Sequence, residues 1–242
     1  MYGKRLTAAD YQALLTCQSV GEVAAYLKQR TVYAQVLSGV NELTIHRGQL
    51  ESLLKKKLFF DFASLGRYEL SVGEHFSDYI IARSEIEQIV HSLMLLVGNR
   101  SEEYIFSMPL FLKQHTHIRL SQLAGLKSYD DLLAAVEGTR YYQLLKPLKP
   151  APGERPNLSI IENSLYAKLY EGVFKIIARY TRGQARKDLE ELFHAFIDLN
   201  NYTRVLRLKH YFHAQPDAIR SMLLPMGRMR PSQLDAMLTA QT

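Results

Sequence analysis

The feature that most constrains the fold is the spacing of apolar residues along three long segments. In each segment they recur at intervals of mostly three or four residues, whereas no stretch shows the alternation and turn spacing of a sheet. An amphipathic helix must bury such a stripe, so we predict an all-α fold in which each stripe faces the core. The three stripes are Leu50, Leu54, Leu58, Phe62 and Leu65; Ile161, Leu165, Leu169, Val173 and Ile176; and Leu189, Leu192, Phe193, Phe196 and Leu199.

Helix boundaries can also be read from the sequence. Ser19 precedes Glu22 by three residues, and Ser128 precedes Asp131 by the same distance. A hydroxyl residue followed in this way by a carboxylate is typical of a helix N-terminus. Residues 146–156 contain four prolines and one glycine. Such a segment cannot continue a helix, so we predict an extended connector there.

The chain also resembles itself. Four pairs of segments match in order at offsets of 109 to 113 residues, and several matches in order at a nearly constant offset indicate a duplicated helical module. We predict two copies, residues 1–127 and 128–242, and the chain ends where a third copy would begin, as in a shortened protein or a fragment. The matching pairs are 19–33 with 128–142, the stripe from Leu50 with the stripe from Ile161, 85–86 with 198–199, and 121–123 with 232–234.

Composition limits the possible classes of protein. No uninterrupted apolar run is longer than that of residues 93–97, and a membrane-spanning helix needs roughly 20 apolar residues, so we expect a soluble or peripheral chain. A single cysteine, Cys17, excludes an internal disulfide framework and indicates a small core residue. The net charge of +6, with a pI near 9.3, permits contact with nucleic acid, an anionic membrane or an acidic protein, and selects none of them.

No arrangement of residues typical of a catalyst is present. The sequence contains no phosphate-binding loop, dinucleotide-binding motif or nucleophile elbow. Neighbouring carboxylates such as Asp130 and Asp131 point in different directions on a helix, so they do not converge on a substrate. The histidine pairs have no further ligand at metal-binding spacing; they are His115 with His117 and His210 with His213. We therefore expect no enzymatic activity, cofactor, metal ion or small-molecule substrate.

Residues 197–209 carry the most specific pattern. They contain Asp198, then Asn201 three residues later, and an aliphatic stretch that ends in Leu206, Arg207 and Lys209. This pattern resembles the signature helix of the C/d family of V/A-type (vacuolar/archaeal-type) rotary ATPase subunits. The apolar-Pro-x-Gly break at 223–227 and the opening segments 5–15 and 23–27 also resemble that family. The first copy departs from the pattern, since it has Glu85 and Gln88 at the Asp and Asn positions.

The resemblance implies a non-catalytic role. Members of this family form a funnel of three helical modules on the membrane rotor ring, and they accept the end of the central shaft. The implied place is the cytoplasmic face of the membrane, as a peripheral protein, and the implied partners are shaft and ring. We interpret Asp198 and Asn201 as a buried polar clamp that fixes helix packing, in preference to a rotor contact. With the third module missing, one wall of the funnel is in doubt.

Two other classes remain open. Arg204, Arg207, Lys209 and His210 lie on or near one predicted helix, as in a basic helical protein that binds nucleic acid. The weakness of this hypothesis is that the Tyr and Phe residues fall on the apolar stripes, which leaves no stacking platform for bases. The third class is a helical-repeat scaffold of unrelated function.

Overall fold

The computed structural model describes residues 5–68 and 73–240, with the side chains of residues 65–74 left out of that description. Every regular element in these ranges is helical, so the predicted all-α class is confirmed. Short 3₁₀ turns lie at Ser101–Glu103, Leu110–Gln114 and Lys146–Leu148. The α-helices are α1 Ala8–Thr16, α2 Val20–Arg30, α3 Arg47–Tyr68, α4 Gly73–Val97, α5 Tyr104–Ser107, α6 Leu120–Leu123, α7 Tyr129–Ala135, α8 Arg140–Leu145, α9 Leu158–Tyr180, α10 Gly183–Phe212, α11 Pro216–Ser221 and α12 Pro231–Thr239.

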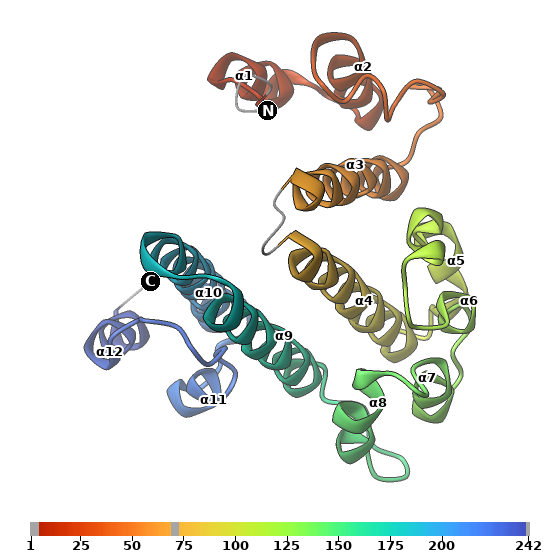
Figure 1. Ribbon diagram of the computed structural model, residues 1–242. Coiled ribbons are helices and arrows are strands. Elements are labelled where there is room, and N and C mark those ends of the chain that lie inside the picture. The colour runs from red at the N-terminus through yellow and green to blue at the C-terminus, as the bar shows by residue number, and fades with distance from the viewer. Residues whose placement is uncertain (1–4, 69–72, 241–242) are drawn as a thin grey trace.

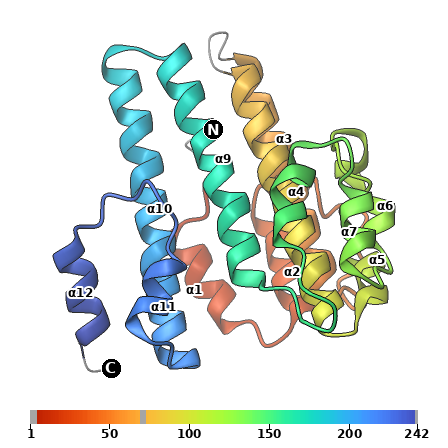
Figure 2. The same cartoon turned by 90° about the horizontal axis from the view of Figure 1, so that it is seen from below.

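Four long helices form the framework (Figure 1). Helices α3 and α4 are packed together, as are α9 and α10, and α4 also packs along α9. Helices α4 and α9 run in opposite directions, and the contact between them joins the two helix pairs into one row (Figures 1 and 2). Helices α5–α8 lie at one end of this row, α1 and α2 lie beyond α3, and α11 and α12 lie beside α10.

The predicted helix starts and the connector are present. The Ser19 hydroxyl accepts a hydrogen bond from the Glu22 amide at the start of α2, and Ser128 does the same for Asp131 at the start of α7. Each hydroxyl satisfies one of the amides that a helix N-terminus leaves unpaired. Residues 149–157 are non-helical, and Asn157 caps the start of α9. The 3₁₀ turn at Lys146–Leu148 and a hydrogen-bonded turn at 151–154 depart from the expected extended connector.

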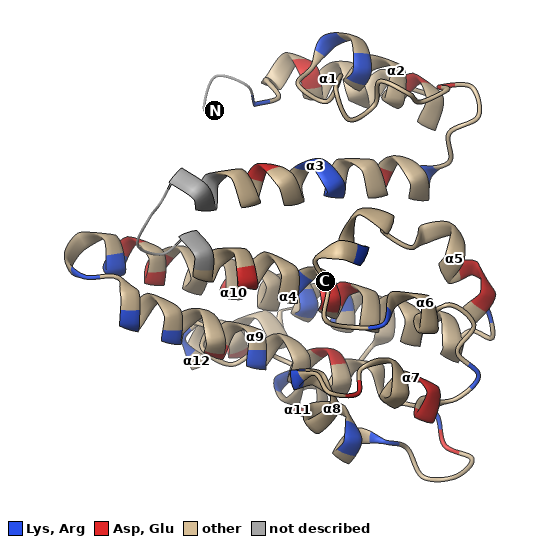
Figure 3. Cartoon of the chain, turned by 45° about the vertical axis from the view of Figure 1, so that its right-hand side comes forward, with Lys and Arg blue, Asp and Glu red and all other residues tan. Residues whose placement is uncertain are grey.

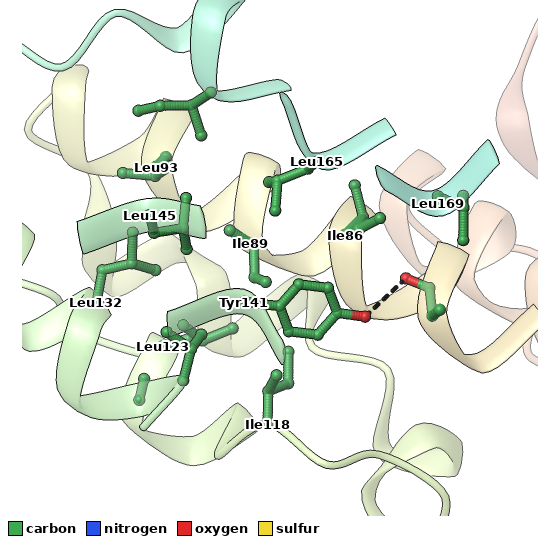
Figure 4. Close-up of a cluster of buried hydrophobic side chains, with 14 of the residues drawn as sticks. Ile86, Ile89, Leu93, Ile118, Leu123, Leu132, Tyr141, Leu145, Leu165 and Leu169 are labelled. Atoms are coloured by element: carbon green, nitrogen blue, oxygen red, sulfur yellow. Dashed lines mark hydrogen bonds between the residues drawn. The ribbon is translucent and has the colours of Figure 1, made fainter. Parts of the chain in front are cut away.

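The main core lies where the two predicted copies meet. Tyr141 of α8 packs among Ile86 and Ile89 of α4, Ile118, and Leu165 of α9 (Figure 4). Two smaller clusters lie at the ends of the framework, one around α1–α3 and one between α10, α11 and α12. Their buried members are Ala24, Leu27, Leu37, Ile45 and Leu50 in the first cluster, and Val205, Ile219 and Leu238 in the second.

The prediction that every stripe faces the core is wrong in part. The stripe on α9 is buried from Ile161 to Val173, and Ile176 is half-buried. In contrast, Leu58 of α3 and Leu192 and Leu199 of α10 are exposed, because their side of each helix is not covered within the described residues. Helical spacing identifies an apolar face, but it does not say whether the same chain covers that face. The side chain of Leu65 lies outside the described residues.

Candidate functional site

Asn201 links α10 to the loop that follows α11. Its side-chain Nδ2 donates to the Leu224 carbonyl over 2.9 Å, and the Leu224 amide donates to its Oδ1 over 2.8 Å. Asn201 is 4% exposed, so both ends of its amide group are satisfied inside the protein. The residue is thus a buried clamp, but it holds a loop against a helix instead of one helix against another.

Asp198 holds the same loop one helical turn earlier. Its carboxylate accepts from the amides of Arg228 and Met229, and the bonds to Oδ1 measure 2.8 and 3.0 Å. Gly227 allows this close approach, since a Cβ atom at that position would lie 2.5 Å from Asp198 Oδ1 and 3.3 Å from Asn201 Nδ2. A steric clash at this site therefore explains why a glycine stands in the apolar-Pro-x-Gly break.

Arg204 is a third contributor, although its sequence context indicated only a positive charge. Its Nη1 donates to the Met222 carbonyl over 2.9 Å and to Asn163 Oδ1 over 3.2 Å. Its Nη2 lies 3.0 Å from Glu162 Oε1 in an ion pair. Arg204 thus joins α9, α10 and the loop. The signal in the sequence was spacing, since Arg204 continues the three-residue step from Asp198 and Asn201 along one side of the helix.

The other two residues of the pattern point to different neighbours. Lys209 donates through Nζ to the Met237 carbonyl over 2.8 Å, and also to the Ala240 carbonyl, at the end of α12. A cation at this position satisfies carbonyls that a helix C-terminus leaves unpaired. Arg207 is exposed and makes no hydrogen bond or ion pair with another described residue. The structure therefore brings Asp198, Asn201 and Arg204 together and leaves Arg207 in solvent.

Glu85 of α4 performs the task of Asp198 in the first half of the chain. It is fully buried, and its Oε1 accepts from the His117 amide over 2.5 Å and from the Thr116 hydroxyl over 3.0 Å. These residues immediately precede α6, just as Arg228 and Met229 precede α12. The longer carboxylate at Glu85 thus bonds the segment before the next short helix, although the first copy departs from the sequence pattern at this position.

Tyr141 and Gln88 complete this second clamp. The Tyr141 hydroxyl donates to Glu85 Oε2 over 2.6 Å. Burial first, and then the charge of Glu85, raise the pKa of Tyr141, so the hydroxyl keeps the proton that it donates. Gln88 accepts through Oε1 from the Tyr104 hydroxyl over 2.9 Å. Gln88 therefore bonds a side chain of α5, whereas Asn201 bonds the backbone of a loop.

Comparison with known proteins identifies the family to which this arrangement belongs. The family model described as ATP synthase (C/AC39) subunit matches residues 1–242. The chain belongs to this family. Similar curated proteins are the C subunits of the A-type ATP synthases of Methanosarcina mazei, 25% identical over 94% of this chain and 61% of the relative, and of Methanosarcina acetivorans, 26% identical over 97% of this chain and 63% of the relative. The chain thus spans about three-fifths of the length of these relatives.

Membership of the ATP synthase (C/AC39) subunit family agrees with the expectation of a non-catalytic part of a rotary ATPase. None of the helices described in this chain is long and apolar enough to span a membrane. Within the same residues, no three His, Cys, Asp or Glu side chains gather as metal ligands would. Of the histidines considered above, His117 lies 3.2 Å from Glu85 and His213 ends α10 in the left-handed conformation.

A groove with a volume of about 490 Å³ lies between α3, α4 and the segment after α5. Its charged groups pair with one another, since Glu87 lies 3.1 Å from Lys55 and 3.4 Å from Arg83. Lys, Arg, Asp and Glu residues are distributed over most of the framework in the same mixed way (Figure 3). The arrangement is that of a structural protein whose polar groups fasten loops to long helices.

Proposed function

We propose that the chain is a non-catalytic adaptor in the central stalk of a V/A-type rotary ATPase. In this role it couples rotation of the shaft to the membrane rotor ring, and it lies at the cytoplasmic face of the membrane as a peripheral protein. The observation that carries the proposal is the match of the ATP synthase (C/AC39) subunit model to residues 1–242. The relatives named as C subunits of A-type ATP synthases support it further.

The mechanical properties of the fold suit this role. An adaptor that transmits torque must resist bending between its two faces, and packed helices resist it because protein interiors are dense and hardly compressible. Helix α10 alone has 30 residues, which corresponds to a length of roughly 45 Å. The clamps at Asp198, Asn201 and Arg204 fasten the adjacent loop to this helix, so the loop moves with the framework.

We also propose that residues 1–127 and 128–242 are copies of one module. The parallel between Glu85 and Asp198 supports this, because each carboxylate accepts from backbone amides just before a short helix. The capped starts of α2 and α7 support it as well. The main core draws on both halves, so the copies are units of sequence that share one core.

The nucleic-acid hypothesis gains one observation. Tyr202, Tyr211 and Phe212 are exposed near Arg207 and His210 on α10, although the sequence analysis had placed the aromatic residues on buried stripes. That statement was wrong for these three side chains, which lie on sides of α10 that the described residues leave exposed. Exposed aromatic rings beside cations are one way to bind single strands, so nucleic acid is the comparator for the binding experiment.

Kinetic binding assays test the proposed function. The purified chain is presented to an isolated coiled-coil shaft protein, to the membrane rotor ring, and to generic single-stranded and duplex DNA. We expect binding to shaft and ring without ATP hydrolysis. Because surface charges are screened over about 8 Å at physiological salt, added salt should slow association more than it speeds dissociation. Binding to DNA at moderate salt, with no binding to shaft or ring, would falsify the proposal.

A further inference from the structure

A small pocket lies between α4, α9 and α10, beside the contacts that Arg204 makes with α9. Its volume of about 150 Å³ leaves room for a phosphate group, whereas pockets for larger ligands have roughly 300–1,000 Å³. We call it the arginine pocket, because its lining includes Arg83 of α4, Tyr170 of α9, and Arg204 and Arg207 of α10.

The arginine pocket carries an excess of positive charge. Its described lining has three arginines and one carboxylate, that of Glu162, which gives a net charge of +2 (3 − 1). Close by, Glu87 lies 3.4 Å from Arg83 and 3.1 Å from Lys55, and Glu87 and Lys55 together add no net charge. Such an excess in one hollow attracts an anion with two negative charges. A phosphate group meets this requirement at neutral pH, because its second pKa is about 6.

Two of the three arginines are already held in position. Three of the five N–H groups of Arg204 donate to α9 and to the loop after α11, so two remain for a ligand. The Nε of Arg83 lies 3.4 Å from Glu87 Oε1, and its guanidinium carbon lies 5.4 Å from the centre of the Phe196 ring. Side chains that are fixed before a ligand arrives lose little freedom on binding, which favours affinity.

Tyr170 offers a further donor to the arginine pocket. The residue is 2% exposed, yet its hydroxyl donates no hydrogen bond to another described residue. The hydroxyl is not sealed off from the pocket, since no fully buried side-chain oxygen or nitrogen of the described residues lacks a partner. Burial raises the pKa of Tyr170, so the hydroxyl keeps its proton at neutral pH. A donor in such a place normally has water or a ligand as its acceptor.

The geometry points to a binding site for a phosphate dianion, held by the three guanidinium groups and the Tyr170 hydroxyl of the arginine pocket. A guanidinium group donates in a planar fork that matches two phosphate oxygens. Arg207 is exposed and has no hydrogen-bond or ion-pair partner among the described residues, so it is free to turn toward the ligand. The dianion is either inorganic phosphate or the phosphate of a monoester. The 490 Å³ groove shares Arg83 and Tyr166 with the pocket, so it offers space for the organic part of a monoester.

Isothermal titration of the full chain with inorganic phosphate, at an ionic strength held constant with chloride, tests the inference. We expect saturable binding with a Kd on the order of 1 mM or tighter, as suits so small a ligand. Tyr170→Phe should raise this Kd at least about fivefold, because it removes one donor to a charged group. The same change should leave the thermal melt of the phosphate-free chain unchanged, since the hydroxyl donates to no described residue there.

A pair of charge-removing variants separates the pocket from the net charge of the chain. Arg207→Gln should raise the Kd about tenfold, because it removes a charge-assisted donor. The matched control is Lys187→Gln, an exposed cation of the same helix. It lies nine residues before Phe196, the first α10 residue of the pocket, or roughly 13 Å along the helix. That distance exceeds the screening length of about 8 Å, so the Kd should change less than about twofold.

Phenyl phosphate in place of inorganic phosphate distinguishes the two sources of the dianion. Tighter binding of phenyl phosphate would assign the site to a monoester, and equal or weaker binding would assign it to inorganic phosphate. The inference is overturned by a lack of saturable binding of either compound, by an unchanged Kd in Tyr170→Phe, or by equal effects of Arg207→Gln and Lys187→Gln. These measurements use the chain alone, so none of the outcomes depends on binding to a shaft or ring.

Discussion

At the scale of single residues, Asn201 has the clearest energetic role. Asn201→Leu should lower the free energy of unfolding by about 1–3 kcal/mol, because the buried amide and carbonyl of Leu224 then lose their partners. The measurement is equilibrium denaturation. Thr203→Val is the control, since its exposed hydroxyl bonds only the Leu199 carbonyl of its own helix, and a change within about 0.5 kcal/mol is expected there. Equal stability of the wild type and Asn201→Leu would contradict the clamp.

Two glycines give a second prediction at this scale. Gly227→Ala should be destabilising by about 1–3 kcal/mol, because the new methyl group displaces the Asp198 carboxylate from the amides that it holds. Gly172→Ala in α9 has open space around its Cβ position and should stabilise the chain by up to ~1 kcal/mol, through helix propensity. Thermal melts of the two variants should therefore shift in opposite directions. A melting temperature of Gly227→Ala equal to or above that of the wild type would show that the Asp198 carboxylate moves aside without cost.

Only part of this site was predictable from sequence. The pattern at Asp198 and Asn201 predicted a buried clamp, because paired polar residues among apolar ones need internal partners. The identity of those partners was not predictable, since the loop residue Leu224 contributes backbone atoms that any residue carries. Arg204 was missed for a related reason. A charged residue on a helix usually points to solvent, and only the structure shows that Glu162 and Asn163 of α9 lie within its reach.

At the scale of elements, Lys209 anchors α12 to α10. Lys209→Met should speed amide hydrogen exchange in α12 about fivefold, because removing the cation from the terminal carbonyls costs about 1 kcal/mol at this partly exposed site. Arg207→Met is the matched control. Its side chain holds nothing within the described part of the chain, so exchange in α12 should stay unchanged. Faster exchange in both variants would point to general loosening of α10 instead of a specific anchor.

The positions of helices were easier to predict than which side of each helix other parts of the chain cover. The stripes and caps located α9 and the starts of α2 and α7, because these signals act within a few residues of sequence. Which side of α10 is covered depends on residues far away in the chain, so the same spacing of leucines predicted burial for Leu192 and Leu199 incorrectly. Phe193 and Ile197 are the buried residues of that helix in the main core, and Leu189 and Phe196 are partly buried against it.

At the scale of the whole molecule, the core that both copies share predicts how residues 1–127 unfold when expressed alone. Residues 1–127 expressed alone should lack a cooperative thermal transition, because Ile86, Ile89 and Leu93 lose α9 and Tyr141. Near-ultraviolet circular dichroism and limited proteolysis measure this directly, with the full chain as reference. A sharp melting transition in the isolated half would instead mean that each copy folds independently.

The position of α4 between α3 and α9 has a consequence for synthesis on the ribosome. Chains emerge from their N-terminus, so α4 is complete long before Tyr180, the last residue of α9, has been added. Throughout that interval the side of α4 that α9 later covers exposes its apolar side chains to solvent. These side chains can then associate with other nascent chains. A chaperone that holds hydrophobic segments would find its binding site there, and a pause in translation before residue 158 would prolong the risk of aggregation.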